Sequence, residues 1–214
     1  MKEIVLELQE EALSSDIDIL SLLRKAYLIA RKLSLSDFSE WLNFEMNGYP
    51  TTCDVPDYRI AYGEIKAWNP YHGWIPVIFD KTTDFHKNEI RDPIASLKSV
   101  YDNSEGQHCL YTYSPEANAL LSKYSPLTTK FSLFVPNNLI FNVFEQVKNK
   151  ILDWAIILEE NGIEGNDLKF TEEEKNRAIN TPVIVNYINN FYSNVIDSQI
   201  QQDTIDSKQS HSNI

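Results

Sequence analysis

Apolar residues in the first 48 positions recur every three or four residues, the spacing of one face of a helix. Three segments show this pattern: residues 2–15, 16–33 and 37–47. Ser36 is placed to cap the start of the third segment, and Gly48 to end it in a left-handed conformation. The sequence therefore predicts an N-terminal layer of three helices joined by short turns, whose apolar faces stack on one another.

The pattern changes after residue 50 to the alternation that is typical of strands. In "YRIAYGEIKAW", residues 58–68, the odd-numbered and even-numbered positions separate into two faces. The turn signal "NPYHG" follows and leads into "WIPVIF", residues 74–79. We expect two strands joined by a tight turn, with Pro76 placing the second strand at a sheet edge or on a bulge.

Further helices and strands follow in alternation. Asp92 as N-cap and Pro93 at the first helical position predict a helix in "RDPIASLKSVYDN", and the Ser114–Pro115 pair predicts another. Two short β-rich runs, "CLYTY" and "KFSLFV", are strand candidates. Apolar residues keep the helical period through residues 137–162, which predicts a long scaffold helix closed by Gly162.

The last predicted helix and the segment after it define the domain organisation. Thr171 and Glu174 have the spacing of a capping box at the start of "TEEEKNRAIN". The expected fold class is α+β: an N-terminal helical layer, a small mixed or antiparallel sheet with inserted helices, a long C-terminal helix and a polar tail. We expect one domain over residues 1–181 and a tail or linker over residues 182–214.

The predicted tail is rich in Asn, Gln and Ser, and "IDS" at residues 196–198 recurs at 205–207. Such a composition buries too little apolar surface to fold alone. Isolated Ile residues amid Gln and Asn nevertheless suit stacked strands, so the tail is a candidate for assembly of copies or for recruiting an effector protein. The residues expected to carry this role are Ile196, Ile200 and Ile205.

The charge balance restricts the partners. Nineteen basic against thirty-one acidic residues give a net charge of −12. Phosphate backbones bind clustered Lys and Arg, so general affinity for nucleic acid or an anionic membrane is not expected. Arg24, Lys25, Arg31 and Lys32 form a strip along one helix side. This strip is either a local basic patch or, as we favour, a solvated face balanced by acidic neighbours.

Cysteine usage and hydropathy restrict the chemistry and the compartment. Cys53 and Cys109 lie far apart and outside any C-x-x-C pattern, so neither a zinc site nor a disulfide framework is indicated. The sequence predicts no cofactor. No signal-peptide pattern opens the chain, and no apolar run approaches the ~18 residues of a membrane span, so we expect a cytoplasmic protein.

The sequence contains no recognisable catalytic motif. The histidines at 72, 86, 108 and 211 match no metalloprotease, deaminase or hydrolase pattern. His108 adjoins Cys109, but adjacent strand residues point to opposite faces, so a structural role is favoured for both. Asp80 and Asp84 flank "KTT" and supply oxygen ligands, but we favour a chain without a bound metal.

The best local candidate for a site is the predicted hairpin around "WNPYHGW", residues 68–74, which is rich in aromatic residues. Its rings suit a nucleobase, another flat ligand or a partner protein, and its histidine supplies a titratable edge. The competing interpretation, which we favour from the residues alone, is that the rings anchor the hairpin against the helices. The candidate contact residues are Trp68, Asn69, Tyr71, His72 and Trp74, with Arg59 as a nearby cation.

Several segments resemble the AbiTii domain of bacterial anti-phage conflict proteins. The resemblance runs through "IVLELQEEALSSDIDILSLLRKAYLIARKL", "DFSEWLNFEMNGY", "VPDYRIAYGEIKAWNPYHGWIPVI" and "VKNKILDWAIILEENGI". It covers roughly residues 3–180, and its most specific points are Trp41, Gly48–Tyr49, "WNPYHGWIPV" and "NKILDWA". It implies a role in abortive infection, the arrest or death of an infected cell that limits phage spread. It carries over no catalytic residues.

Two functional hypotheses follow. In the first, the chain is a non-enzymatic sensor or adaptor, whose domain recognises a partner and whose tail assembles copies or recruits an effector. In the second, the chain is itself a toxin acting on RNA or nucleotides, with His72 as acid or base and Arg59 or Arg91 holding a phosphate.

Overall fold

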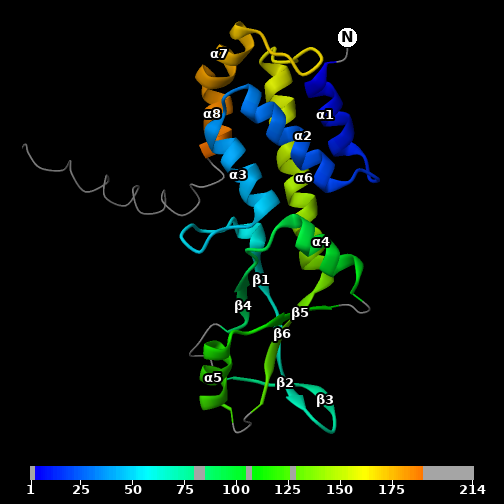
Figure 1. The fold of residues 1–214 in the computed structure, drawn as a ribbon, viewed down its shortest axis with the longest axis vertical. Coiled ribbons are helices and arrows are strands. Elements are labelled where there is room, and N and C mark those ends of the chain that lie inside the picture. Colours follow the sequence, from blue (N-terminus) through cyan, green and yellow to red (C-terminus); the bar gives the residue numbers. More distant parts are fainter. Residues whose placement is uncertain (1–2, 80–84, 105–107, 126–128, 190–214) are drawn as a thin grey trace, which may run out of the picture.

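A computed structural model of the chain describes residues 3–79, 85–104, 108–125 and 129–189. Figure 1 shows an elongated molecule, with most helices gathered at one end and the strands at the other. The predicted α+β class, the N-terminal helical layer and the long scaffold helix are confirmed. The sheets are antiparallel throughout.

The order of elements follows the predicted alternation. The helices are α1 (Ile4–Leu13), α2 (Ile19–Lys32), α3 (Ser36–Asn47), α4 (Ile94–Asp102), α5 (Pro115–Lys123), α6 (Asn137–Glu160), α7 (Glu172–Asn180) and α8 (Pro182–Asn189), with a 3-10 turn, η1, at Asp57–Arg59. The strands are β1 (Ile60–Tyr62), β2 (Glu64–Asn69), β3 (Gly73–Pro76), β4 (Lys87–Glu89), β5 (His108–Thr112) and β6 (Phe131–Pro136).

The helical end is organised around α6, against which α1, α2, α4 and α8 all pack. Trp154 on α6 is completely buried, and its ring stacks on Phe38 of α3 at a centroid distance of 4.2 Å. The broad apolar stripe of α2 is buried on more than one side, through Leu22, Leu23 and Ala26. A packed aromatic and aliphatic core of this kind contributes most of a domain's stability.

The strand end contains a four-stranded sheet of order β3-β2-β6-β5 and a two-stranded sheet of β1 and β4. The predicted hairpin is confirmed: β2 and β3 pair from Asn69 with Gly73 to Lys66 with Pro76. As Pro76 indicates, β3 lies at an edge of the sheet. The inserted helices are α4, before β5, and α5, between β5 and β6.

The prediction of one continuous strand over residues 58–68 is wrong. The structure begins this stretch with η1 and then divides it at Gly63 into β1 and β2, which belong to different sheets. A Cβ atom on Gly63 would lie 2.6 Å from the backbone oxygen of Phe134. The chain thus passes from one sheet to the other at Gly63, the only glycine of this stretch, where its backbone comes close to the backbone of Phe134.

Two predicted helix starts are displaced by one residue. The N-cap of α3 is Leu35, and the Ser36 hydroxyl donates to the Asp37 carboxylate instead. The N-cap of α4 is Pro93, and the Asp92 carbonyl before it accepts from Arg59 Nη1. The Ser114 cap and the Thr171–Glu174 capping box are confirmed, as are the positive φ angles of Gly48 and Gly162.

The first eight residues of the predicted tail form a helix. In α8, Ile184 is completely buried, and the Tyr187 hydroxyl donates to the Lys150 carbonyl of α6. The assembly residues Ile196, Ile200 and Ile205 lie outside the described residues. Among the helices that the structure describes, none is long and apolar enough to cross a membrane.

Candidate functional site

The pairing register divides the four-stranded sheet into two faces, because neighbouring residues of a strand point to opposite sides. On one face, Ile65 and Ala67 of β2 lie beside Leu133 and Phe131 of β6, and all four are completely buried. The opposite face carries the alternate residues of the four strands, among them Glu64, Lys66, Trp68, Trp74, Pro76, Phe134, His108 and Leu110.

A row of rings crosses this second face. Trp68 and Trp74 are cross-strand partners whose centroids lie 5.4 Å apart in an edge-to-face arrangement. Trp74 meets Phe134 at 5.6 Å, and Phe134 meets His108 at 6.4 Å. We call Trp68, Trp74, Phe134 and His108 the aromatic row; it draws on all four strands of the sheet.

The aromatic row is accessible to solvent, and the sheet that carries it is packed against the core on its reverse face. The side chain of Trp68 is 43% exposed and that of neighbouring Leu110 is 50% exposed. The Lys66 ammonium lies 4.6 Å from the centre of the Phe134 ring. Rigid rings on a sheet packed from behind provide a large contact area at a small cost in side-chain entropy. The arrangement therefore suits the binding of another molecule against the exposed rings.

The turn residues have a different role from the two tryptophans. The Asn69 side-chain oxygen accepts from the backbone N–H groups of Tyr71 and His72, at 2.8 and 3.1 Å. Asn69 therefore shapes the turn, as an Asx-turn does. The Tyr71 side chain is 89% exposed at the tip, and His72 is exposed beside it. The structure thus brings Trp68 and Trp74 together and presents Tyr71 and His72 at the end of the hairpin.

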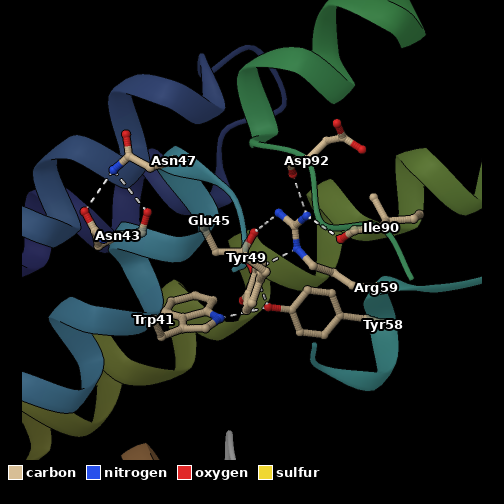
Figure 2. A network of polar contacts seen from close by, with 9 residues as sticks. All are labelled: Trp41, Asn43, Glu45, Asn47, Tyr49, Tyr58, Arg59, Ile90 and Asp92. Atoms are coloured by element: carbon tan, nitrogen blue, oxygen red, sulfur yellow. Dashed lines mark hydrogen bonds and ion pairs between the residues drawn. The ribbon is translucent and has the colours of Figure 1, made fainter. Parts of the chain in front are cut away.

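Arg59, in η1 before β1, belongs instead to a buried network between α3 and the strands (Figure 2). Its Nη2 donates to Glu45 Oε2 at 2.5 Å and its Nε to Glu45 Oε1 at 3.1 Å. Its Nη1 donates to the carbonyl groups of Ile90 and Asp92. Both charged side chains are completely buried, so this pair joins α3 to the start of β1 and to the segment before α4.

Two phenols complete the network. The hydroxyls of Tyr49 and Tyr58 both donate to Glu45 Oε1 at 2.7 Å, and Trp41 Nε1 donates to the Tyr58 oxygen. Burial, and then the Glu45 carboxylate, raise the pKa of both tyrosines. Burial alone would lower the pKa of Arg59, but the Glu45 carboxylate outweighs it and the pKa is raised. The phenols therefore stay protonated and the Arg59 guanidinium stays charged, as a structural network requires.

The structure does not bring together the residues of the toxin hypothesis. Arg59 is enclosed at the Glu45 pair beside β1, while His72 lies in the turn between β2 and β3. Figure 1 shows this hairpin at the end of the strand region away from β1. The Arg91 guanidinium donates to the carbonyls of Pro50 and Cys53 and pairs with Glu89.

Cys109 and His108 lie on opposite faces of β5, as the strand pattern predicts. Cys109 is buried, its thiol donates to Asn137 Oδ1, and burial raises its pKa. His108 is exposed next to Phe134. The thiol and the imidazole therefore have separate surroundings.

Phe134, His108 and Leu110 were not among the candidate site residues. The signal for Phe134 is its parity in "KFSLFV": Phe131, Leu133 and Val135 alternate onto the buried face, which leaves Phe134 on the other. Its meeting with Trp74 depends on β6 pairing with β2, a contact between segments about sixty residues apart. That pairing is not readable from a local pattern.

The metal and basic-strip interpretations have different outcomes. Asp80 and Asp84 lie outside the described residues. Within the part of the chain that the structure describes, no group of three His, Cys, Asp or Glu side chains is placed to hold a metal ion. In the basic strip, Lys25 pairs with Glu11 and with Glu7, the latter at 3.0 Å, so this lysine has the acidic neighbours that we expected.

Acidic charge is unevenly distributed along the chain. Residues 57–136, which include every strand, carry eight Lys or Arg and nine Asp or Glu. Eleven of the twelve net negative charges therefore belong to the segments before and after them. The sheet region is nearly neutral and the helical region strongly acidic.

Comparison with known proteins identifies the family. The AbiTii family model matches residues 3–182. The chain belongs to the AbiTii family. This agrees with the resemblance found in the sequence and implies a role in abortive infection, the anti-phage response in which an infected cell arrests or dies. Neither the curated proteins nor the solved structures include a match to this AbiTii chain.

Proposed function

We propose that this AbiTii protein is a non-enzymatic sensor or adaptor of an abortive-infection system, and that the aromatic row is the surface that contacts its protein partner. The observation that carries the proposal is the row itself. Trp68, Trp74 and Phe134 form a continuous, partly exposed set of rings on a sheet face whose reverse side is packed into the core.

Composition and charge support a protein as the partner. Tryptophan and other aromatic residues are enriched where interfaces concentrate their binding energy. Depletion of charged residues is typical of the centre of such interfaces, and the aromatic row contains no Asp, Glu, Lys or Arg. Lys66 is the cation beside the row, and it pairs with Glu64 at 3.1 Å. A phosphate backbone is bound by several clustered cations, so the row fits a protein surface better than a nucleic acid.

The described buried charges support a binding role rather than a catalytic one. Glu45 and Arg59 satisfy each other, and the Glu174 carboxylate accepts from the backbone N–H groups of Glu164, Gly165 and Thr171. Each of these groups holds segments of the fold together. A general acid or base needs instead a free position beside a reacting atom.

Replacing two rings of the row tests the proposal. In a strain that the wild-type chain protects from phage, Trp68→Ala with Trp74→Ala should raise plaque formation at least tenfold, because the contact surface is lost while the sheet core remains. The matched control is Phe141→Ala, which removes a ring 47% exposed on α6, away from the row. Circular dichroism and the urea midpoint of each protein establish that it is folded. Full protection by a folded double variant would refute the proposed surface.

A further inference from the structure

On the outer edge of β5, a row of backbone hydrogen-bonding groups is paired with no strand among the residues that the structure describes. The Trp68 N–H donates to the Lys130 carbonyl, so even-numbered residues of β6 bond toward β2 and odd-numbered residues toward β5. In β5, Cys109 and Tyr111 pair with these odd-numbered residues. The N–H and C=O groups of His108, Leu110 and Thr112 consequently point away from the sheet, where no strand of the described chain pairs with them.

A groove runs beside this edge, between β5 and α4. It encloses about 210 Å³ and is lined mainly by apolar side chains, among them Leu97 and Val100 of α4, Cys109 and Leu110 of β5, and Ile140 of α6. Val100 is 49% and Leu110 is 50% exposed at its rim. An open strand edge beside an apolar groove is the arrangement that binds an extended peptide by strand addition.

The other edge of the sheet is less suited to pairing. It is formed by β3, which has four residues and ends in Pro76, a residue without an N–H group. β5 has five residues, none of them Asp, Glu, Lys or Arg. Because β5 itself contains neither a charged residue nor a proline, an added strand fits it better than β3.

A segment of this chain matches the groove. Residues 196–200, "IDSQI", have the length of β5. In an extended conformation Ile196, Ser198 and Ile200 share one side, with Asp197 and Gln199 on the other. Such alternation suits a strand with one side toward an apolar groove and the other toward solvent.

The geometry favours a segment from another molecule. Figure 1 shows α8 and α4 on different sides of α6. Only six residues separate the end of α8 at Asn189 from Ile196, so these two residues lie at most ~25 Å apart. A tail of the same molecule would have to pass around the helical layer, whereas the tail of a second copy approaches the open edge directly.

We propose that residues 196–200 of one copy add as a strand to the β5 edge of a second copy, with Ile196 and Ile200 covering the groove beside α4. The contact is heterologous, tail to groove, so each copy has one of each and chains extend or close into rings. This inference does not depend on the partner proposed for the aromatic row.

The mass of the intact chain in solution tests the inference. Wild-type protein should exceed the mass of one chain, 24.7 kDa, as concentration rises. Leu110→Pro removes an outward N–H and leaves the bonds to β6, and Val100→Lys charges the groove rim. Each should weaken self-association at least tenfold, as should Ile196→Ser with Ile200→Ser. The control is Leu120→Lys, a leucine 37% exposed on α5, which should associate like wild type.

A mixing experiment tests the tail-to-groove arrangement. Leu110→Pro has a blocked groove and an intact tail, and Ile196→Ser with Ile200→Ser has the reverse. Each variant should be a single chain alone, while the mixture should form a one-to-one complex and nothing larger. The inference is overturned by a wild-type protein that stays a single chain, by groove variants that associate like wild type, or by a mixture without a complex.

Discussion

The Glu45 carboxylate shows how much of the fold depends on one side chain. It is completely buried and accepts from Tyr49, Tyr58 and Arg59, which belong to the connection between the helical layer and the sheets. Removing one partner of a buried pair leaves the other charge without compensation. The network therefore determines how the sheet region is attached to α3.

Glu45→Gln should lower the free energy of unfolding by about 3–5 kcal/mol, because the Arg59 guanidinium remains buried without its counter-charge. Tyr58→Phe removes the hydrogen bond to the same carboxylate and the one from Trp41 Nε1, and should cost about 1–3 kcal/mol. Urea unfolding of the three proteins measures both values. Equal stability of Glu45→Gln and wild type would show that the pair does not hold the junction.

Glu174 makes a pH-dependent contribution. Burial would raise its pKa, but the backbone N–H groups of Thr171, Gly165 and Glu164 outweigh it, so the folded pKa is lowered. The unfolded value is about 4.3. The stabilisation is therefore complete above that pH and is lost as pH falls through the folded pKa.

Glu174→Gln should destabilise the protein by about 1–3 kcal/mol at pH 7, since charge-assisted hydrogen bonds are lost. The difference from wild type should shrink as pH falls below about 4.3 and through the lowered folded pKa, as the wild-type carboxylate becomes protonated. Thermal unfolding across this range measures it. Glu173→Gln, at an exposed neighbouring position, is the control, and a pH-independent difference for Glu174→Gln would contradict the assignment.

At the scale of elements, Gly63 decides how the strands are divided. It separates β1 from β2, and a Cβ atom there would meet the Phe134 carbonyl at 2.6 Å and the Leu133 side chain at 2.8 Å. Gly73, in the hairpin, has φ of +71°, but a Cβ atom there would meet only the Trp68 ring, at an ordinary contact distance of 4.0 Å. The two glycines are thus required for different reasons, close packing and backbone conformation.

Gly63→Ala should therefore destabilise the protein more than Gly73→Ala. The second change costs about 1–2 kcal/mol of backbone strain. The first forces β2 and β6 apart and should exceed that value. Chemical denaturation of both variants provides the comparison, and a Gly63→Ala protein as stable as wild type would mean that the strand break does not depend on close approach.

The elements could be predicted from the sequence where a local pattern defines them. The helical period of residues 137–162, the Thr171–Glu174 capping box and the turn at 69–73 each depend on near neighbours. The division at Gly63 and the burial of Arg59 depend on Phe134 and Glu45, which are distant in sequence. The tryptophan pair was predicted as a candidate site, but its extension to Phe134 and His108 follows from strand order.

At the scale of the whole molecule, the two ends differ in chemistry. The helical end contains the main core and most of the net negative charge, while the strand end is nearly neutral and presents the aromatic row. Net charge keeps a protein soluble and discourages contact between like surfaces. Association is therefore expected at the strand end, where both the aromatic row and the β5 edge lie.

The most direct test of the account is bacterial growth after inducing the intact chain, with and without phage. A sensor or adaptor that contacts a partner through the aromatic row should leave uninfected cultures growing normally at high expression, and should limit phage spread only when infection supplies its trigger. Growth arrest in uninfected cells, retained by folded protein carrying Trp68→Ala and Trp74→Ala, would contradict the account and identify the chain as a toxin acting elsewhere.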